Sequence, residues 1–317
     1  MYKVSVIVPV YNAGKHLEKC VRSLFEQTLS DIEYIFVNDC TPDNSMEILE
    51  TIIREYPKRA KDITIINHER NTGQSGARKD GMKVASGEYI IHCDADDWID
   101  HDMYECMYNK AKEDDVEAVC CDIVMEFLDS RKILRVNGEH DDHMLMYECK
   151  APISVEYFSM CNRMVSRKVY ERHTIEPFEG VNMWDDVGLA TRVRFYCRST
   201  SVINREFYHY NRQNEVSTTR RPLDERYREQ SLCIDFIEQF FRTEGVLEKY
   251  RLFISYLRAH SAEDIFRHDI DLWRETFEVV KNDLKRLPYK KSRLRRFNIA
   301  GNGGYLGKII WKLLWKR

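Results

Sequence analysis

The sequence is poor in residues that loosen a chain, and it lacks long apolar runs. Its 317 residues include only 7 prolines and 13 glycines, so we expect no disordered linker. No apolar run approaches the roughly 20 residues of a membrane-spanning helix. The apolar start, MYKVSVIVPVYN, is short and is followed by no small-residue cleavage signal. The sequence therefore predicts neither a transmembrane segment nor a secretory leader.

Motifs of several nucleotide- and metal-binding classes are also missing. The ten cysteines are scattered and form no CxxC pair, which predicts reduced thiols and a cytoplasmic location. There is no GxxxxGK[ST] loop and no HExxH, and GNGGYLG near the end of the chain lacks the GxGxxG spacing. These absences argue against P-loop, zinc-peptidase and dinucleotide-binding proteins.

The net charge of −3 conceals an uneven distribution. Residues 281–317 hold twelve Lys or Arg and one acid, a net charge of +11, whereas the rest of the chain carries −14. After the polybasic stretch KKSRLRRF, residues 290–297, five apolar residues recur on one helix face: Leu306, Ile309, Ile310, Leu313 and Leu314. This pattern predicts a basic amphipathic helix that binds anionic lipid, with packing on this chain or on a second copy as an equal alternative. No nucleic-acid recognition module accompanies it, so a nucleic-acid partner is not expected.

Short apolar stretches alternate with helical patterns in the first hundred residues. We predict four strands there, at residues 3–10, 33–39, 62–67 and 87–93. This order is typical of an α/β protein whose mostly parallel, Rossmann-like sheet is flanked by helices. Further strands are predicted at 116–124 and 200–210, and residues 224–287 have a helical pattern. Ligands of such sheets gather at the carboxyl ends of the strands.

The stretch HCDADDW, residues 92–98, stands at such a strand end. Asp94 and Asp96 are two positions apart, so in extended chain their carboxylates point to the same side. Hard carboxylate oxygens in this arrangement suit Mg²⁺ or Mn²⁺, with open positions for substrate phosphates. The alternative is a solvated loop in which Asp97 or Asp100 caps the following helix.

Two other acidic stretches are open to more than one interpretation. Asp185 and Asp186 follow Trp184. They suit either proton abstraction near a metal–diphosphate site or the start of a helix, where acids are favoured. HDDH, residues 140–143, is interpreted as a solvated loop and not as a metal site, because its residues are sequential and not spaced across a fold.

Four segments, in this order and spacing, resemble the family 2 glycosyltransferases. They are VSVIVPVYNAGKHLEKCVRSLFEQT, VNDCTPDNS, NTGQSGARKDGMKVASGEYIIHCDADDW, and FEGVNMWDDVGLATRV with the later YHYNRQNEVST. The resemblance covers roughly residues 1–220 and implies the GT-A fold, with a nucleotide-binding half at 1–100 and an acceptor-side half at 101–220. Residues 221–317 would form a helical extension that ends in the basic amphipathic helix.

The resemblance also implies an activity. A sugar would be transferred, with inversion, from a nucleotide-diphosphate donor to a hydroxyl of a glycan or lipid-linked glycan. UDP is the expected nucleotide, and Mn²⁺ or Mg²⁺ the expected cofactor. The enzyme would work in the cytoplasm, at the inner face of the membrane if its acceptor is lipid-linked.

Two other functions remain as alternatives. A sugar-1-phosphate nucleotidyltransferase has a related sheet but needs a Gly-rich loop after the first strand, where VPVYNAGKH has a single Gly. A non-catalytic nucleotide-sugar-binding scaffold would need neither Asp96 nor Asp186, and both are present.

The resemblance carries roles over residue by residue. Nucleotide-binding roles are implied for Pro9, Val10, Tyr11, Asp39, Arg78 and Asp94. Metal-binding roles are implied for Asp96 and Asp94, with His209 as a further ligand. Asp186 matches the general base and Asp185 the acid beside it, whereas Arg212 lies in a segment that can close over the diphosphate.

The sequence departs from the family pattern within these segments. Cys40 stands where Gly is usual, in the turn after the second strand. Lys79 stands where Asn is expected, and Asp185 replaces Glu with a shorter side chain. His92 and Cys93 replace apolar residues before the acidic stretch.

Overall fold

The computed structural model describes residues 1–136, 155–214, 218–266 and 269–302, together with Met146, Cys149 and Ile309. The HDDH stretch and most of the amphipathic tail lie outside these residues, so the predictions made for them stay predictions. The chain divides into two compact units, residues 1–139 with 154–218 and residues 140–153 with 219–317. No described helix is long and apolar enough to cross a membrane.

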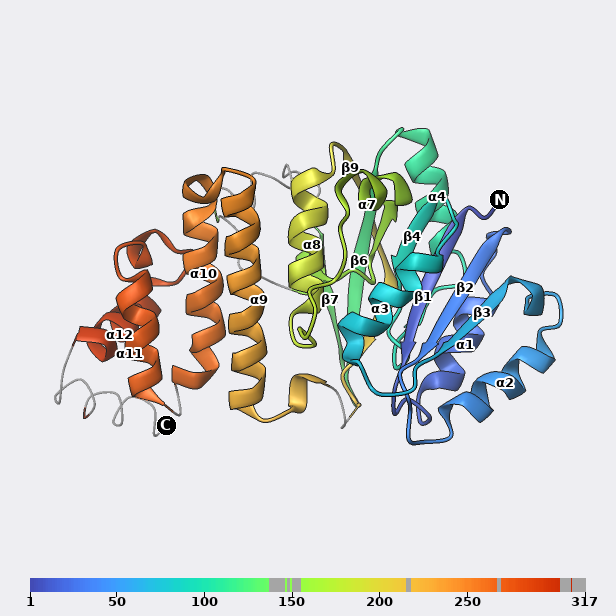
Figure 1. Cartoon of the computed structure of the whole chain (residues 1–317), viewed down its shortest axis with the longest axis horizontal. Coiled ribbons are helices and arrows are strands. Elements are labelled where there is room, and N and C mark those ends of the chain that lie inside the picture. The colour runs from blue at the N-terminus through green and yellow to red at the C-terminus, as the bar shows by residue number, and fades with distance from the viewer. Residues whose placement is uncertain are drawn as a thin grey trace. The chain divides into compact units, whose positions relative to one another are not determined.

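The described part of the first unit is built on a sheet of nine strands (Figure 1). They are β1 (Val4–Val10), β2 (Ile32–Asn38), β3 (Ile63–Asn67), β4 (Tyr89–His92), β5 (Trp98–Ile99), β6 (Ala118–Glu126), β7 (Arg131–Leu134), β8 (Arg163–Ser166) and β9 (Thr200–Asn211). Their order is β3-β2-β1-β4-β8-β6-β9-β5, and β7 pairs with β6. The first four strands are parallel, whereas β5, β7 and β8 run antiparallel to their neighbours. The predicted α/β class with a flanked, Rossmann-like sheet is confirmed, and the second half of the sheet is mixed.

Helices cover both faces of this sheet. α1 (Leu17–Phe25), α2 (Ser45–Glu55) and α4 (Met103–Glu113) share one hydrophobic core with the strands. α3 (Gly73–Val84) packs on the opposite face of β1 and β2. The remaining helices described in the unit are α6 (Val155–Phe158), α7 (Arg167–His173) and α8 (Asp185–Tyr196), with a 3-10 turn η1 (Ala60–Asp62).

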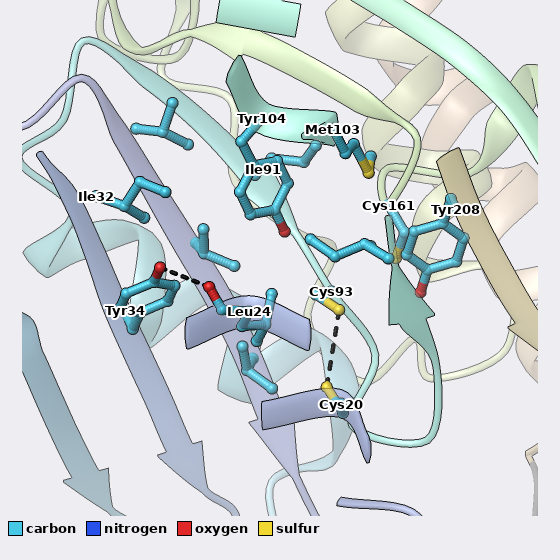
Figure 2. Close-up of a cluster of buried hydrophobic side chains, with 14 of the residues drawn as sticks. Cys20, Leu24, Ile32, Tyr34, Ile91, Cys93, Met103, Tyr104, Cys161 and Tyr208 are labelled. Atoms are coloured by element: carbon cyan, nitrogen blue, oxygen red, sulfur yellow. Dashed lines mark hydrogen bonds between the residues drawn. The ribbon is translucent and has the colours of Figure 1, made fainter. Parts of the chain in front are cut away.

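The core under α1 and α4 is apolar with a few buried polar atoms (Figure 2). Alternate residues of β1 point into it, as the two-residue period of a strand requires: Val4, Val6, Val8 and Val10. The Tyr34 hydroxyl donates to the Leu24 carbonyl at 2.7 Å. The sulfur atoms of Cys20 and Cys93 lie 3.9 Å apart. The hydrogen bond with Cys20 and burial raise the pKa of Cys93, so it stays an unreactive thiol.

A close approach of α3 to the sheet brings its polar side chains to the strand ends. A Cβ at Gly81 would lie only 2.5 Å from the Ile7 side chain, so only glycine lets the helix pack this closely. Arg78 lies three residues earlier, on the same helix face, and is completely buried. The glycine of the third motif segment therefore positions the arginine of the same segment.

The second unit is helical among its described residues. Its helices are α9 (Leu223–Thr243), α10 (Leu247–Phe266), α11 (Ile270–Val280) and α12 (Lys291–Asn302), with 3-10 turns η2 (Thr218–Arg220) and η3 (Leu284–Arg286) bordering or within it. The buried Trp273 ring of α11 lies 4.5 Å from the Phe297 ring of α12. Lys290, Lys291 and Arg295 are exposed. The polybasic stretch thus forms part of a helix that packs on one face and exposes charge elsewhere.

Candidate active site

The carboxyl ends of β1 and β2 are neighbours in the sheet. Pro9 and Val10 pair with the last two residues of β2, and the N–H of Asp39 donates to the Val10 carbonyl at 3.0 Å. Tyr11, the next residue, is 50% exposed. The structure therefore brings together these four residues, for which a nucleotide-binding role is predicted.

Asp39 connects the end of β2 to the start of α3. Its carboxylate accepts the N–H groups of Thr72 and Gly73, both at 2.7 Å, and the Thr72 hydroxyl at 2.9 Å. Nδ1 of His68 lies 2.8 Å away. Because a carboxylate is favoured at the N-terminus of a helix, these contacts fix where α3 begins. Cys40 has a φ of 57°, the conformation that glycine adopts easily, so the turn keeps its shape with a different residue.

Arg78 lies between the two acidic segments. Oδ1 of Asp94 accepts Nη2 of Arg78 at 2.8 Å and Nε2 of Gln74 at 2.9 Å. Nη1 of Arg78 lies 3.0 Å from Oδ2 of Asp185 and also contacts Asp186. These last two contacts lack hydrogen-bond geometry and are ionic. Burial lowers the pKa of Arg78, but the charges of Asp185 and Asp94 outweigh it and raise the pKa above its usual value. One buried cation thus compensates three carboxylates.

The second acidic pair begins α8. Trp184 precedes it, at the N-cap of α8, with a φ of 70°, an unusual conformation for a bulky residue. Oδ2 of Asp186 accepts the N–H of Met160 at 3.2 Å. The Asp186 side chain remains 24% exposed, whereas that of Asp185 is 8% exposed. Asp186 is therefore oriented from two sides and still reachable from solvent.

Neutral donors hold the other two aspartates of the acidic turn, residues 94–97. Asp96 accepts Nδ2 of Asn214 at 2.7 Å. Asp97 accepts the N–H of Asn211 at 2.7 Å and the hydroxyl of Tyr208. Burial, and then the charge of the neighbouring aspartates, raises the pKa of both carboxyls, that of Asp97 well above its usual range. Within the described part of the chain, neither carboxylate forms an ion pair with Lys or Arg.

The acidic turn offers carboxylate oxygens, the ligand atoms that a hard divalent cation prefers. Its oxygens carry negative charge that the arginine of α3 compensates only at Asp94, and each of Asp94 and Asp96 has hydrogen bonds at one oxygen. Among the described residues, no three or more His, Cys, Asp or Glu side chains form a metal-binding group. A cation here would therefore use two carboxylates and take its remaining ligands from substrate or water.

Among the described residues, the ring nitrogens of His209 contact carboxylates other than the predicted metal ligands. Its ring stacks on Trp98, with centroids 5.2 Å apart, and its nitrogens face Glu126 at 2.8 Å and Asp100 at 3.1 Å. Its metal-binding role stays a prediction that these contacts do not support. Arg212 follows β9, and its N–H donates to the Glu126 carbonyl at 2.9 Å.

The fold is that of the GT-A glycosyltransferases. The structure of S. aureus TarS 1–349 in complex with UDP-GlcNAc aligns with a TM-score of 0.70 at 15% identity and covers 99% of this chain and 90% of that one. A mannosyltransferase from Pyrobaculum calidifontis, in complex with GDP-Man and Mn²⁺, aligns with a TM-score of 0.54 at 17% identity, covering 100% and 84%. At such identities the likeness establishes the fold alone.

Sequence comparison then gives the family. The model described as glycosyl transferase family 2 matches residues 5–174, and the chain belongs to this family. EpsH of Bacillus subtilis (strain 168), named as a glycosyltransferase, is 31% identical over 255 residues, 78% of this chain and 72% of that protein. The cholesterol galactosyltransferase of Borreliella burgdorferi is 26% identical over 261 residues, 78% and 70%. The predicted family is confirmed, and the chain is a glycosyltransferase.

Several residues that hold the site were missed in the sequence. They are Gln74, Met160, Asn182, Tyr208, Asn211 and Asn214. All except Met160, which acts through its backbone, lie inside the four motif segments. The uncharged amides and hydroxyls inside those segments could have indicated these residues, because such groups donate hydrogen bonds to carboxylates without neutralising them.

We expect Arg78→Met to lower the free energy of unfolding by about 3–5 kcal/mol, because it leaves the buried Asp185 beside two more carboxylates with no cation. Arg78→Lys keeps the charge and should lose less. Urea denaturation measures both variants. Lys79→Met is the matched control, since Lys79 is partly exposed and pairs only with Glu176 among its described contacts; it should change stability by less than about 0.5 kcal/mol. A loss below about 1 kcal/mol in Arg78→Met would contradict the bridging role.

Asp97→Asn should stabilise the cation-free protein at neutral pH. The pKa of Asp97 is raised in the folded state, so above the unfolded carboxyl pKa, about 3.9, the unfolded chain ionises first and stability falls. The advantage of the variant should be absent below that pH, grow as the pH rises toward the folded-state pKa of Asp97, and stay constant above it. Thermal unfolding in a chelator at a series of pH values measures the stability of both proteins. The other titrating groups contribute equally to both, so the difference between variant and wild type reports Asp97. A variant less stable than wild type at every pH would refute this expectation.

Proposed function

We propose that this glycosyltransferase is metal-dependent and inverting, and that it transfers sugar from a UDP-sugar to a hydroxyl of a glycan or lipid-linked glycan. Family membership and the likeness to a TarS structure holding UDP-GlcNAc support a nucleotide-sugar donor. The observation that carries the proposal is the double contact of Arg78, which joins the acidic turn to Asp185 and Asp186. Asp94, which we place beside the sugar donor, and Asp186, the candidate base, thus contact the same side chain, that of Arg78.

Asp186 is the residue we assign as general base. In a displacement with inversion, the acceptor hydroxyl attacks from the side opposite the leaving diphosphate, and its proton must be accepted there. Asp186 is oriented by the Met160 N–H and by Arg78, and its side chain is 24% exposed. Asp185 is too buried to meet an acceptor and is assigned to holding Arg78.

The nucleotide would lie at the ends of β1 and β2. Tyr11 extends half exposed beyond β1 and offers a ring face for stacking, with Pro9, Val10 and Asp39 beside it. Arg78 is completely buried, so we assign it to positioning Asp94 and not to direct contact with phosphate. The family resemblance implies a nucleotide-binding role for Arg78, and we assign it an indirect one, exerted through Asp94.

Asp96 and Asp94 would hold the divalent cation, Mn²⁺ or Mg²⁺. Bound there, it would offset the negative charge that develops on the leaving diphosphate. The raised pKa of Asp96, caused by burial and then by Asp94, supports this assignment, because the two like charges lie close enough to repel. The Mn²⁺ in the Pyrobaculum calidifontis structure is a further, more distant support.

We propose a cytoplasmic enzyme that meets its acceptor at the membrane surface. One relative is named for a sterol acceptor, which resides in membranes. The exposed basic residues before and along α12 (Lys290, Lys291 and Arg295) offer a surface for anionic lipid. Self-association of the chain stays a prediction.

Titration calorimetry with UDP, GDP and dTDP, each with and without Mn²⁺, tests donor and metal. We expect metal-dependent binding of UDP in the wild type and its loss in Asp96→Ala. If no nucleotide binds in a metal-dependent way, the proposal fails. Release of diphosphate from a nucleoside triphosphate and a sugar-1-phosphate would instead favour the nucleotidyltransferase alternative.

Asp186→Asn should bind UDP and Mn²⁺ as the wild type does but lower kcat by about 10²–10⁴-fold, the usual contribution of a general base. The readout is sugar transfer to an acceptor panel, with Asp129→Asn, a change at an exposed residue between β6 and β7, as the control. Unchanged turnover would remove Asp186 from the mechanism. Binding without turnover by the wild type across the panel would favour the scaffold alternative.

Replacing Lys290, Lys291 and Arg295 by Gln should weaken binding to anionic vesicles by about 100-fold, at about 1 kcal/mol per charge. Co-sedimentation of the full chain measures it. This variant leaves the Trp273–Phe297 contact intact, unlike removal of α12. Neutral vesicles are the control, and equal binding of variant and wild type to anionic vesicles would exclude these residues as the lipid-binding surface.

A further inference from the structure

The end of β9 and the residues after it hold the acidic turn. Asn214 donates Nδ2 to Oδ2 of Asp96 at 2.7 Å, and Asn211 donates Nδ2 to the Asp96 carbonyl at 3.1 Å. The N–H of Asn211 and the Tyr208 hydroxyl both donate to the Asp97 carboxylate. Three residues of this segment, Tyr208, Asn211 and Asn214, thus contact the turn through both its backbone and its carboxylates.

The two aspartates assigned to the cation have partners of different charge. Asp94 is paired with the guanidinium of Arg78, which cancels part of its charge. Asp96 is paired with the amide of Asn214, which fixes the carboxylate by a hydrogen bond but leaves its full charge. The amide bonds to Oδ2, and among the described side chains no other donor reaches this carboxylate. Oδ1 of Asp96 is therefore an oriented anionic oxygen.

We propose that Asn214 is a positioning residue that sets the affinity of the site for a divalent cation by orienting Asp96. The inference rests on the proposed metal-dependent function. Hydrogen-bond partners of a metal-binding carboxylate typically change metal affinity by about 10–100-fold when removed. Asn214 acts through Asp96, so its effect belongs to cation binding and not to proton transfer at Asp186.

Removal of the Asn214 amide should leave the turn in place. Asp97 stays bonded to Asn211 and Tyr208, and the Asp94 N–H stays on the Tyr208 hydroxyl at 3.3 Å. Asn214 also follows the last residue of β9, so no strand pairing depends on it. A change in cation affinity can thus be separated from a loss of fold.

Electron paramagnetic resonance of free Mn²⁺, with the full chain and saturating UDP, measures the effect directly. We expect Mn²⁺ affinity to fall by about 10–100-fold in Asn214→Ala and by less in Asn214→Ser, which keeps a shorter donor. The Mn²⁺ concentration that half-saturates sugar transfer should rise by the same factor, whereas kcat at saturating Mn²⁺ should stay near that of the wild type. Gln213→Ala is the matched control, because this exposed amide points to the Phe127 carbonyl at 3.4 Å and should bind Mn²⁺ normally.

Each outcome decides the question. Wild-type Mn²⁺ affinity in Asn214→Ala overturns the role of Asn214 alone, and so does an equal loss in Gln213→Ala, which would indicate a general effect of the segment. If Asn214→Ala does not fold, wild-type affinity in Asn214→Ser overturns the proposal. If the wild type itself binds no Mn²⁺ with UDP, the proposed metal dependence fails first and this inference fails with it.

Discussion

Compensation of negative charge at the carboxyl edge of the sheet is the constraint on which the site depends. Two short segments supply five aspartates there, and the buried Arg78 contacts three of them. A buried charge is costly unless it is paired, so these carboxylates require the cation as much as it requires them. Arg78 reaches them because Gly81 lets α3 lie close on β1. The packing of α3 on the sheet therefore determines whether the charges of the site are compensated.

α3 is the common support of the parts that must act together. Its first turn is fixed by Asp39 at the proposed nucleotide-binding end, and a side chain at Gly73 would collide with Asn182, which packs there. Further along, Gln74 and Arg78 hold the acidic turn and the start of α8. Because a helix is a rigid element, the distances between nucleotide end, acidic turn and candidate base are set by one body. A shift of α3 would change the proposed donor and acceptor sides together.

The spacing of apolar residues and the motifs predicted the long strands and helices well. They did not predict which side chains meet in the folded protein. The strand expected at residues 3–10 is β1 (Val4–Val10), and that at 200–210 is β9 (Thr200–Asn211). β5, β7 and β8 have only two to four residues each, too few to show a period. The burial of Arg78 against Asp185 joins residues more than 100 positions apart, which no local pattern contains. His209 shows the converse: a motif position was predictable, whereas its carboxylate neighbours were not.

The hydrogen-bond partners of the acidic turn differ in charge, and this difference bears on the proposed function. Arg78 offsets the charge at Asp94, whereas Asp96 and Asp97 are held by amides and a hydroxyl, which carry no charge to offset theirs. An uncompensated buried carboxylate lowers stability, and such a cost is tolerated mainly where function needs it. A second arginine at this side would stabilise the fold but remove the attraction for a cation. Neutral donors instead orient the carboxylates without offsetting their charge, which is the arrangement that the proposed divalent ion at Asp96 would need.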